Sequence, residues 1–249
     1  MKPIPKILIL SLLWCSCQRE KNEPIHSINI VTIVDITDPQ TILPDAEPIL
    51  KLYGFDSDKS NAATFRITNV TDRQLNPALE FHLSDGTVTE KDNKEDDPYH
   101  REKLIVAFYE TVRKAVTTFN SIHRNDSSLR HSECFSTICS ELQLMQKRGA
   151  SNNILLVFSD QQENSELFSC YTKANQLLLH KSPKEVARHL ESFHLLPENL
   201  KGYTIFFVYQ PKTREEDQKY LEMMTVYKML LEPRGATVTI QASNNSYTL

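Results

Sequence analysis

The chain of 249 residues is poor in glycine and has no excess of basic side chains. Its five glycines form neither GxGxxG nor GxxxxGKS/T, which argues against the two familiar loops that cradle nucleotide phosphates. The formal net charge is -4 and the isoelectric point is near 6.1, and the basic residues form no stripe. The balance of charge therefore argues against a nucleic-acid-binding protein.

Long apolar runs are also lacking, except near the N-terminus. Residues 1–17 begin with Lys2 and Lys6, continue with the apolar stretch ILILSLLW and end in CSC. A basic start, a short apolar run and a junction of small residues are typical of a secretory signal, and this run is too short for a permanent transmembrane helix. We therefore predict that residues 1–17 direct export.

The cysteine at the end of this stretch resembles the lipid acceptor of bacterial lipoproteins. Cys17 follows the small residue Ser16, although Trp14 stands where such sequences usually carry leucine. We predict lipidation of Cys17, a polar tether over residues 18–27, and location as an outer-membrane or periplasmic lipoprotein, with exposure at the cell surface as a variant of this reading. The alternative is a plain cleaved signal with incidental cysteines.

Three cysteines remain, Cys134, Cys139 and Cys170. An odd number gives no evident disulfide framework, and the first two are five apart on a predicted helix, which is a poor spacing for a bridge. We interpret them as small core residues. Together with His131 they could be imagined as a zinc set, but CxxC and HxxxH patterns are lacking, which favours a structural role.

Two kinds of apolar pattern predict strands. The stretches INIVTIVDI (28–36) and NILLVF (153–158) are nearly continuous apolar runs, as expected for buried parallel strands. The stretches ATFRITNV (63–70) and ALEFHLS (78–84) alternate in part and are joined by a short polar link, which favours an antiparallel pair toward an edge. Further strands are expected over 202–211 and 235–242.

Helical patterns fill the intervals between these strands. A short helix should end at Gly54, and longer helices are predicted over 99–122, 132–148, 182–193 and 213–233. Ser132 and Ser182 are the expected N-caps of two of them.

The positions of three glycines favour a parallel sheet. Gly149, Gly202 and Gly235 each lie between a predicted helix and the next strand, where a left-handed cap is needed. Returns of this kind indicate right-handed βαβ units. The prediction is a single α/β domain over residues 28–249, with a three-layer, doubly wound, mostly parallel sheet and one antiparallel edge strand.

Two of the predicted strands end in acidic residues. Asp35, Thr37 and Asp38 follow the first strand, and Asp160 follows the strand that ends at residue 158. The carboxyl ends of such strands converge where the strand order reverses, and Ser132 at a helix start can reach the same rim. These hard oxygen ligands suit Mg²⁺ or Mn²⁺. Alternatively, the two carboxylates only cap helix N-termini and order the loops.

The order of elements resembles the von Willebrand factor A (VWA) domain over residues 28–242. That family's metal-ion-dependent adhesion site uses a DxSxS motif after the first strand, a Thr before a central helix and an Asp ending the fourth strand. The resemblance implies that Asp35 and Thr37 match the first two positions of DxSxS, that Ser132 stands for the Thr and that Asp160 is the last Asp. In that family a partner's carboxylate fills the open coordination position.

One residue departs from the motif. The third position of DxSxS is Pro39, which has neither a side-chain oxygen nor an amide donor. Asp38 is the candidate substitute, through a shifted loop, and the alternative is a site that binds metal weakly or not at all.

An enzymatic function is not favoured. A phosphatase of the haloacid dehalogenase type needs a second Asp where this chain has Thr37, and Ser159 lacks the GxSxG elbow of hydrolases. The resemblance implies a lipid-anchored module that binds an acidic residue of a protein partner at the cell envelope, with Mg²⁺ or Mn²⁺ as cofactor. The alternative is a metal-independent component of an envelope, secretion or conjugation machine.

Overall fold

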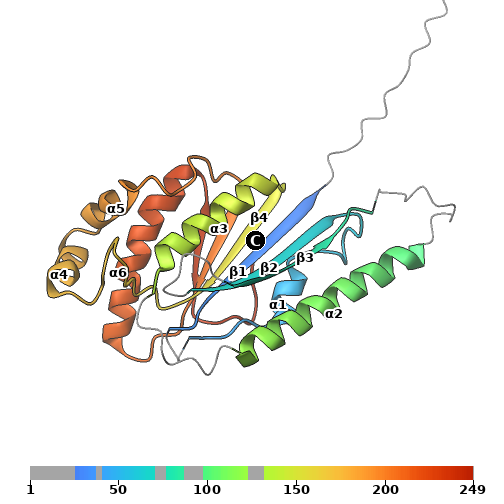
Figure 1. Cartoon of the computed structure of the whole chain (residues 1–249), viewed down its shortest axis with the longest axis horizontal. Coiled ribbons are helices and arrows are strands. Elements are labelled where there is room, and N and C mark those ends of the chain that lie inside the picture. The colour runs from blue at the N-terminus through green and yellow to red at the C-terminus, as the bar shows by residue number, and fades with distance from the viewer. Residues whose placement is uncertain (1–25, 38–40, 71–76, 87–97, 123–131, 249) are drawn as a thin grey trace, which may run out of the picture.

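A six-stranded sheet organises the protein, whose computed structural model describes residues 26–37, 41–70, 77–86, 98–122 and 132–248. The strand order across the sheet is β3-β2-β1-β4-β5-β6 (Figure 1). The strands are β1 (Ser27–Asp35), β2 (Ala62–Val70), β3 (Ala78–Leu83), β4 (Asn152–Phe158), β5 (Tyr203–Val208) and β6 (Thr237–Gln241). The helices are α1 (Ala46–Lys51), α2 (Pro98–Ile122), α3 (Cys134–Arg148), α4 (Lys173–Lys181), α5 (Pro183–Glu191) and α6 (Arg214–Leu231).

All neighbouring strands are parallel except β2 and β3, which pair antiparallel at one edge. This confirms the predicted α/β class, with a mostly parallel sheet flanked by helices and one antiparallel edge strand. β1 and β4 are the central strands. From β1 the strands β2 and β3 follow toward one edge of the sheet, and from β4 the strands β5 and β6 follow toward the other. The order therefore reverses between β1 and β4, where such folds place their ligands.

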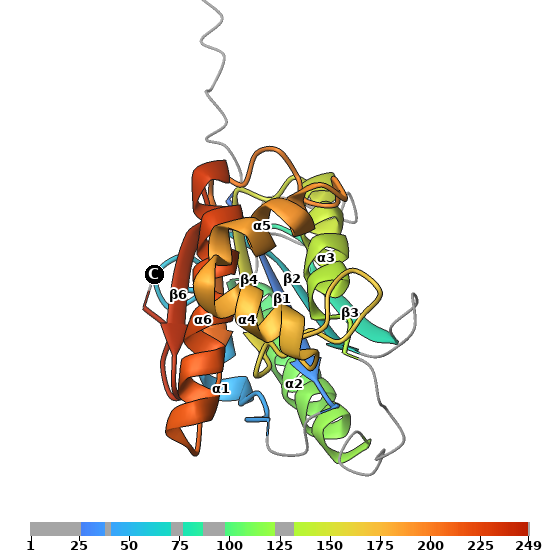
Figure 2. The ribbon, with the colours of Figure 1, turned by 90° about the vertical axis from the view of Figure 1, so that its left-hand side faces the viewer.

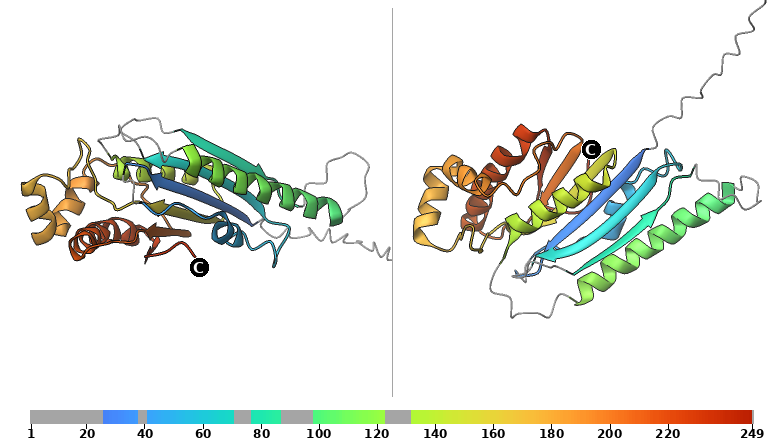
Figure 3. Two further views of the ribbon diagram at one scale, coloured as in Figure 1. Left: turned by 90° about the horizontal axis from the view of Figure 1, so that it is seen from below. Right: turned by 45° about the horizontal axis from the view of Figure 1, so that its top comes forward.

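Helices cover both faces of the sheet because β1 is apolar on both sides. Ile30 and Val34 are buried in the core that includes α1 and α2, whereas Val31 and Ile33 are buried in the core that includes α3 and α6. Successive side chains of a strand point to opposite faces, so a nearly continuous apolar run serves two layers. Along the edge next to β3, α2 follows the strand (Figure 3).

A bidentate ion pair fixes α3 on the sheet. Arg66 of β2 donates from Nε to Oε2 of Glu141 on α3 over 2.8 Å and from Nη2 to Oε1 over 3.0 Å. The parallel N–H donors of the guanidinium match the two carboxylate oxygens, which restricts rotation as well as distance. The pair therefore ties the middle of α3 to β2.

Glycines in the left-handed conformation lie between helices and the strands that follow them, as predicted. Gly149 ends α3 with a φ of 67°, and Gly235 follows a 3-10 turn at Glu232–Arg234 with a φ of 96°. At Gly235 a Cβ would also lie 3.3 Å from backbone atoms of Lys201. A side chain is therefore disfavoured there both by the backbone angle and by the close approach of the neighbouring segment.

Several predicted helix details are wrong. Glu133, not Ser132, is the residue before α3, and its side chain makes no capping hydrogen bond. Ser182 precedes α5 as expected, but its side chain also caps nothing. The sequence prediction missed α4, which Thr172 caps by accepting from the amide of Asn175. Among the described residues, no helix is long and apolar enough to cross a membrane.

Candidate functional site

The carboxylate of Asp35 forms the centre of the site at the end of β1. Asp35 is 1% exposed, and its Oδ1 accepts hydrogen bonds from the amide and the hydroxyl of Thr37, at 2.9 and 2.6 Å. Its Oδ2 accepts from Ser132 Oγ at 3.0 Å and from Ser159 Oγ at 2.8 Å. Both oxygens therefore have partners, and three of the predicted site residues, Asp35, Thr37 and Ser132, do lie together.

The strand register explains this meeting. Val34 of β1 lies beside Phe158 of β4, so the next residues, Asp35 and Ser159, come out of the sheet side by side. Ser132 is brought to the same place by an isolated bridge, in which its backbone pairs with Asn164 of the loop after β4. Three segments that are far apart in sequence therefore converge on one carboxylate.

Two residues of this cluster were not predicted as site residues. Ser159 contributes the second hydroxyl on Oδ2, and Cys134 places its thiol 3.4 Å from Oδ2 and 3.1 Å from Ser132 Oγ. Burial, together with the nearby charge of Asp35, raises the pKa of the Cys134 thiol well above its ordinary value. The thiol is therefore a poor nucleophile, and its position is that of a buried packing residue.

Asp160 lies next to this cluster and is half-buried. Its Oδ1 accepts from the backbone amide of Gln162 at 2.9 Å, two residues on, as Asp35 does from the amide of Thr37. Both carboxylates thus order the turns that follow their strands, which agrees with the loop-ordering alternative for part of their role. Asp38 and Pro39 lie outside the described residues. We call Asp35, Thr37, Ser132, Ser159 and Asp160 the β1–β4 rim.

A second acid, which sequence reasoning missed, lies behind the rim. Glu163 is 0% exposed, and its Oε2 accepts from the backbone amide of Phe135 at 2.8 Å, in the first turn of α3. The start of a helix carries unpaired amides and a partial positive charge, so a carboxylate is stabilised there. The backbone amide of Glu163 in turn donates to the carbonyl of Gln161, a buried residue with a φ of 59°.

The surroundings of Glu163 oppose its ionisation. Burial raises its pKa from 4.5 to about 7, and the charges of Glu133 and Asp35 add to this effect, whereas the amide of Phe135 acts against it. The nearby Tyr171 is 62% exposed on the loop after β4, yet shielding of its hydroxyl and the charge of Asp160 raise its pKa to about 12. The rim is therefore a region of negative potential.

The oxygen atoms of the rim are of the type that binds a hard cation. Each hydroxyl that donates its hydrogen to Asp35 keeps its lone pairs, so Thr37 and Ser132 can act as oxygen ligands while Asp35 supplies charge. No group of three or more His, Cys, Asp or Glu side chains that could hold a metal occurs in the described part of the chain. A metal at the rim would therefore depend on hydroxyl ligands.

The cysteines are buried, as the sequence predicts. Cys134, Cys139 and Cys170 are free thiols with exposures of 2% or less. His131, the fourth member of the alternative zinc set, lies outside the described residues.

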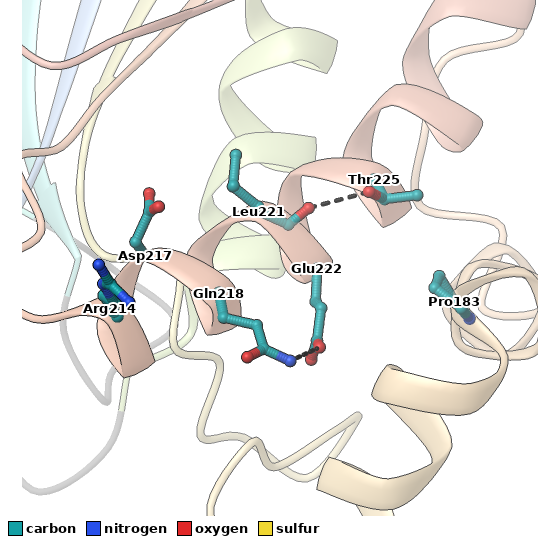
Figure 4. A pocket seen from close by; sticks show the side chains of 7 residues that line it. All are labelled: Pro183, Arg214, Asp217, Gln218, Leu221, Glu222 and Thr225. Carbon is teal, nitrogen blue, oxygen red and sulfur yellow. Dashed lines mark hydrogen bonds between the residues drawn. The ribbon is translucent and has the colours of Figure 1, made fainter.

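Two shallow hollows lie on the side of the molecule formed by α4, α5 and α6. The larger has a volume of about 310 Å³ (Figure 4). It is lined by Pro183, Arg214, Asp217, Gln218, Leu221, Glu222 and Thr225. The smaller, of about 170 Å³, includes Gln162 and Cys170 from the loop after β4. In the larger one the amide of Gln218 donates to Glu222 over 3.0 Å.

Comparison with known proteins identifies no family for this chain. No protein-family model and no curated protein sequence matches the chain. The fold and the rim therefore define a class, a doubly wound, Rossmann-like α/β protein with a buried carboxylate at its switch point.

The buried Glu163 should make the stability of the protein depend on pH. Its raised pKa means that the folded state binds a proton more tightly than the unfolded state, so this residue costs stability progressively as pH rises from about 4.5 to about 7. The shift corresponds to a loss of about 3 kcal/mol above that window. Glu163→Gln keeps an oxygen for the Phe135 amide but cannot ionise. In urea unfolding, the free energy of unfolding of the variant should therefore increase relative to that of the wild type as pH rises from 5 to 8. An equal difference at both pH values would contradict the assignment.

Proposed function

We propose that this protein is a lipid-anchored, VWA-like module that binds a protein partner at the cell envelope through the β1–β4 rim. The observation that carries the proposal is the arrangement around Asp35, where a buried carboxylate at the switch point orients the hydroxyls of Thr37 and Ser132. The strand order, with β3 antiparallel at the edge, agrees with the order of elements on which the resemblance to VWA domains rests.

A divalent cation fits this arrangement. Thr37 and Asp160 are only partly buried, so an ion could reach them from solvent. Ser132 is buried, but its hydroxyl binds the same carboxylate as the hydroxyl of Thr37. We propose Thr37, Ser132 and Asp160 as the residues that hold Mg²⁺ or Mn²⁺, with Asp35 positioning the hydroxyls from behind. When bound, such an ion supplies a positive charge that attracts a carboxylate of the partner.

A second candidate function rests on the same carboxylate. Both oxygens of Asp35 already accept hydrogen bonds from within the chain, so the rim keeps its shape without an ion. In this reading the protein is a metal-independent component of an envelope, secretion or conjugation machine, and the rim is only the fixed edge of a binding surface. The two readings differ in whether a cation binds, and that difference can be measured.

The cation reading predicts millimolar or tighter binding of Mg²⁺ or Mn²⁺ to the purified protein. Calorimetric titration should give a saturating signal, and the melting temperature should rise with ion concentration because the ion binds only the folded state. Thr37→Val and Asp160→Asn should abolish both effects while keeping the side-chain shape, since the first removes a hydroxyl ligand and the second removes a negative charge and one of two carboxylate oxygens.

Matched controls come from the exposed side of α6. Thr225→Val and Asp217→Asn make the same chemical changes at exposed residues of α6 that are not part of the rim, and they should leave ion binding unchanged. A wild-type protein that shows neither heat nor a shift in melting with either ion would refute the cation reading and leave the metal-independent one. Equal losses in the controls would show that the ions bind the surface without specificity.

The lipid anchor has a test of its own. We propose that export removes the first sixteen residues and leaves a diacylglyceryl group on Cys17, whose position after Ser16 fits a lipid acceptor. Mass spectrometry of the protein from its native membranes should find a chain that begins at a modified Cys17. A mature chain that keeps Met1, or one without lipid, would contradict the anchor while leaving the rim proposal intact.

A further inference from the structure

The outer side of β6 is an open edge of the sheet. β6 pairs with β5 on its inner side, and within the described residues no strand pairs with its other side. Figure 2 shows β6 at the margin of the ribbon, next to α6. Such an edge presents backbone N–H and C=O groups to solvent and can accept an added strand.

The pairing with β5 identifies the groups that point outward. Tyr209 donates its amide to the carbonyl of Gln241 over 3.0 Å, so the backbone groups of Gln241 face β5. In a parallel pair, alternate residues turn both their N–H and their C=O toward the same neighbour. Thr239 therefore also faces β5, whereas Val238 and Ile240 turn their backbone groups outward.

The segment after β6 leaves this edge uncovered. Asn244 donates from its side chain to the carbonyl of Leu43 over 2.7 Å, and the ring of Tyr247 packs against Phe206 of β5 at 5.1 Å between centroids. Phe206 lies in the core on the α1 and α2 side of the sheet. The chain therefore turns beneath the sheet after β6 and does not run along its outer side.

The edge also lacks the usual protection against pairing. Charged residues make up 24% of the whole chain, but residues 235–249 contain no Asp, Glu, Lys, Arg or His. The opposite edge strand, β3, carries Glu80 and His82 and has α2 alongside it. Monomeric proteins commonly block edges with charges, proline or bulges. β6, with the sequence TVTIQ, contains no charged residue and no proline.

We propose that β6 is a homodimer interface, in which β6 of one copy pairs antiparallel with β6 of a second copy across a twofold axis. Thr239 would lie on the axis, and Val238 of each copy would exchange both backbone hydrogen bonds with Ile240 of the other. The two sheets would join into one continuous sheet. This inference does not depend on the rim or on a cation.

A second copy fits this edge better than an unrelated strand for two reasons. Only residues with outward backbone groups, Val238 and Ile240, need partners, and the antiparallel twofold arrangement matches each with the other. The pairing also brings two uncharged segments together, so no like charges meet. A five-residue strand buries less than the roughly 800 Å² per partner of a typical stable interface, so we expect the dimer to be weak and to form only at high protein concentration.

Sedimentation velocity over a wide range of protein concentrations tests the proposal. The wild type should shift from monomer to dimer as the concentration rises. Thr239→Lys sets two lysines opposite each other at the axis and should keep the protein monomeric throughout. Thr225→Lys adds the same charge on the exposed face of α6 and should dimerise as the wild type does.

Val238→Pro provides a second variant. It removes an outward N–H and no hydrogen bond to β5, so the fold, checked by circular dichroism, should persist while the dimer is lost. Amide hydrogen exchange at Val238 and Ile240 should slow with concentration in the wild type. A wild type that stays monomeric with concentration-independent exchange would overturn the proposal, as would a dimer that survives both Thr239→Lys and Val238→Pro.

Discussion

The buried carboxylate of Asp35 is the constraint on which the candidate site depends. A carboxylate removed from water loses several kcal/mol of hydration unless hydrogen bonds replace it. Here the replacement comes from Thr37 on the following turn, from Ser132 before α3 and from Ser159 after β4. The carboxylate therefore holds three segments together at the point where the strand order reverses, and the shape of the rim follows from that requirement.

The loop after β4 extends this constraint away from the sheet. Through the bridge between Asn164 and Ser132, and through Glu163 on the amide of Phe135, the loop is joined to the start of α3. Two buried acids, Asp35 and Glu163, thus both lie near the start of α3. The carboxylate of Asp35 disfavours an anionic ligand at the rim.

The sequence was sufficient to predict the sheet because its signals are local. The apolar runs of β1 and β4 and the glycines after the helices depend only on burial and on backbone angles, and they led to the correct class, a mostly parallel sheet with one antiparallel edge strand. The signal for α4 was weak, because Leu177, Leu178 and Leu179 are consecutive and only Leu179 is buried. A run of this kind has no helical period.

Part of the site also escaped prediction, for a different reason. Ser132 was identified for its position before a helix, but its hydroxyl serves Asp35 and not the helix amides. Ser159 and Glu163 depend on contacts between distant segments, and nothing in their local sequence distinguishes them from ordinary loop residues. Such contacts become visible only when the strand register is known.

The most direct test of the central role of Asp35 is a double-mutant cycle on stability with Asp35→Asn and Ser132→Ala, measured by urea unfolding. If the carboxylate and the hydroxyl act as one unit, their coupling energy should be about 1–3 kcal/mol, whereas the distant pair Asp35→Asn and Thr225→Val should add within about 0.5 kcal/mol. Simple additivity of Asp35→Asn and Ser132→Ala would contradict the account, because the two segments would then be held together by something other than this carboxylate.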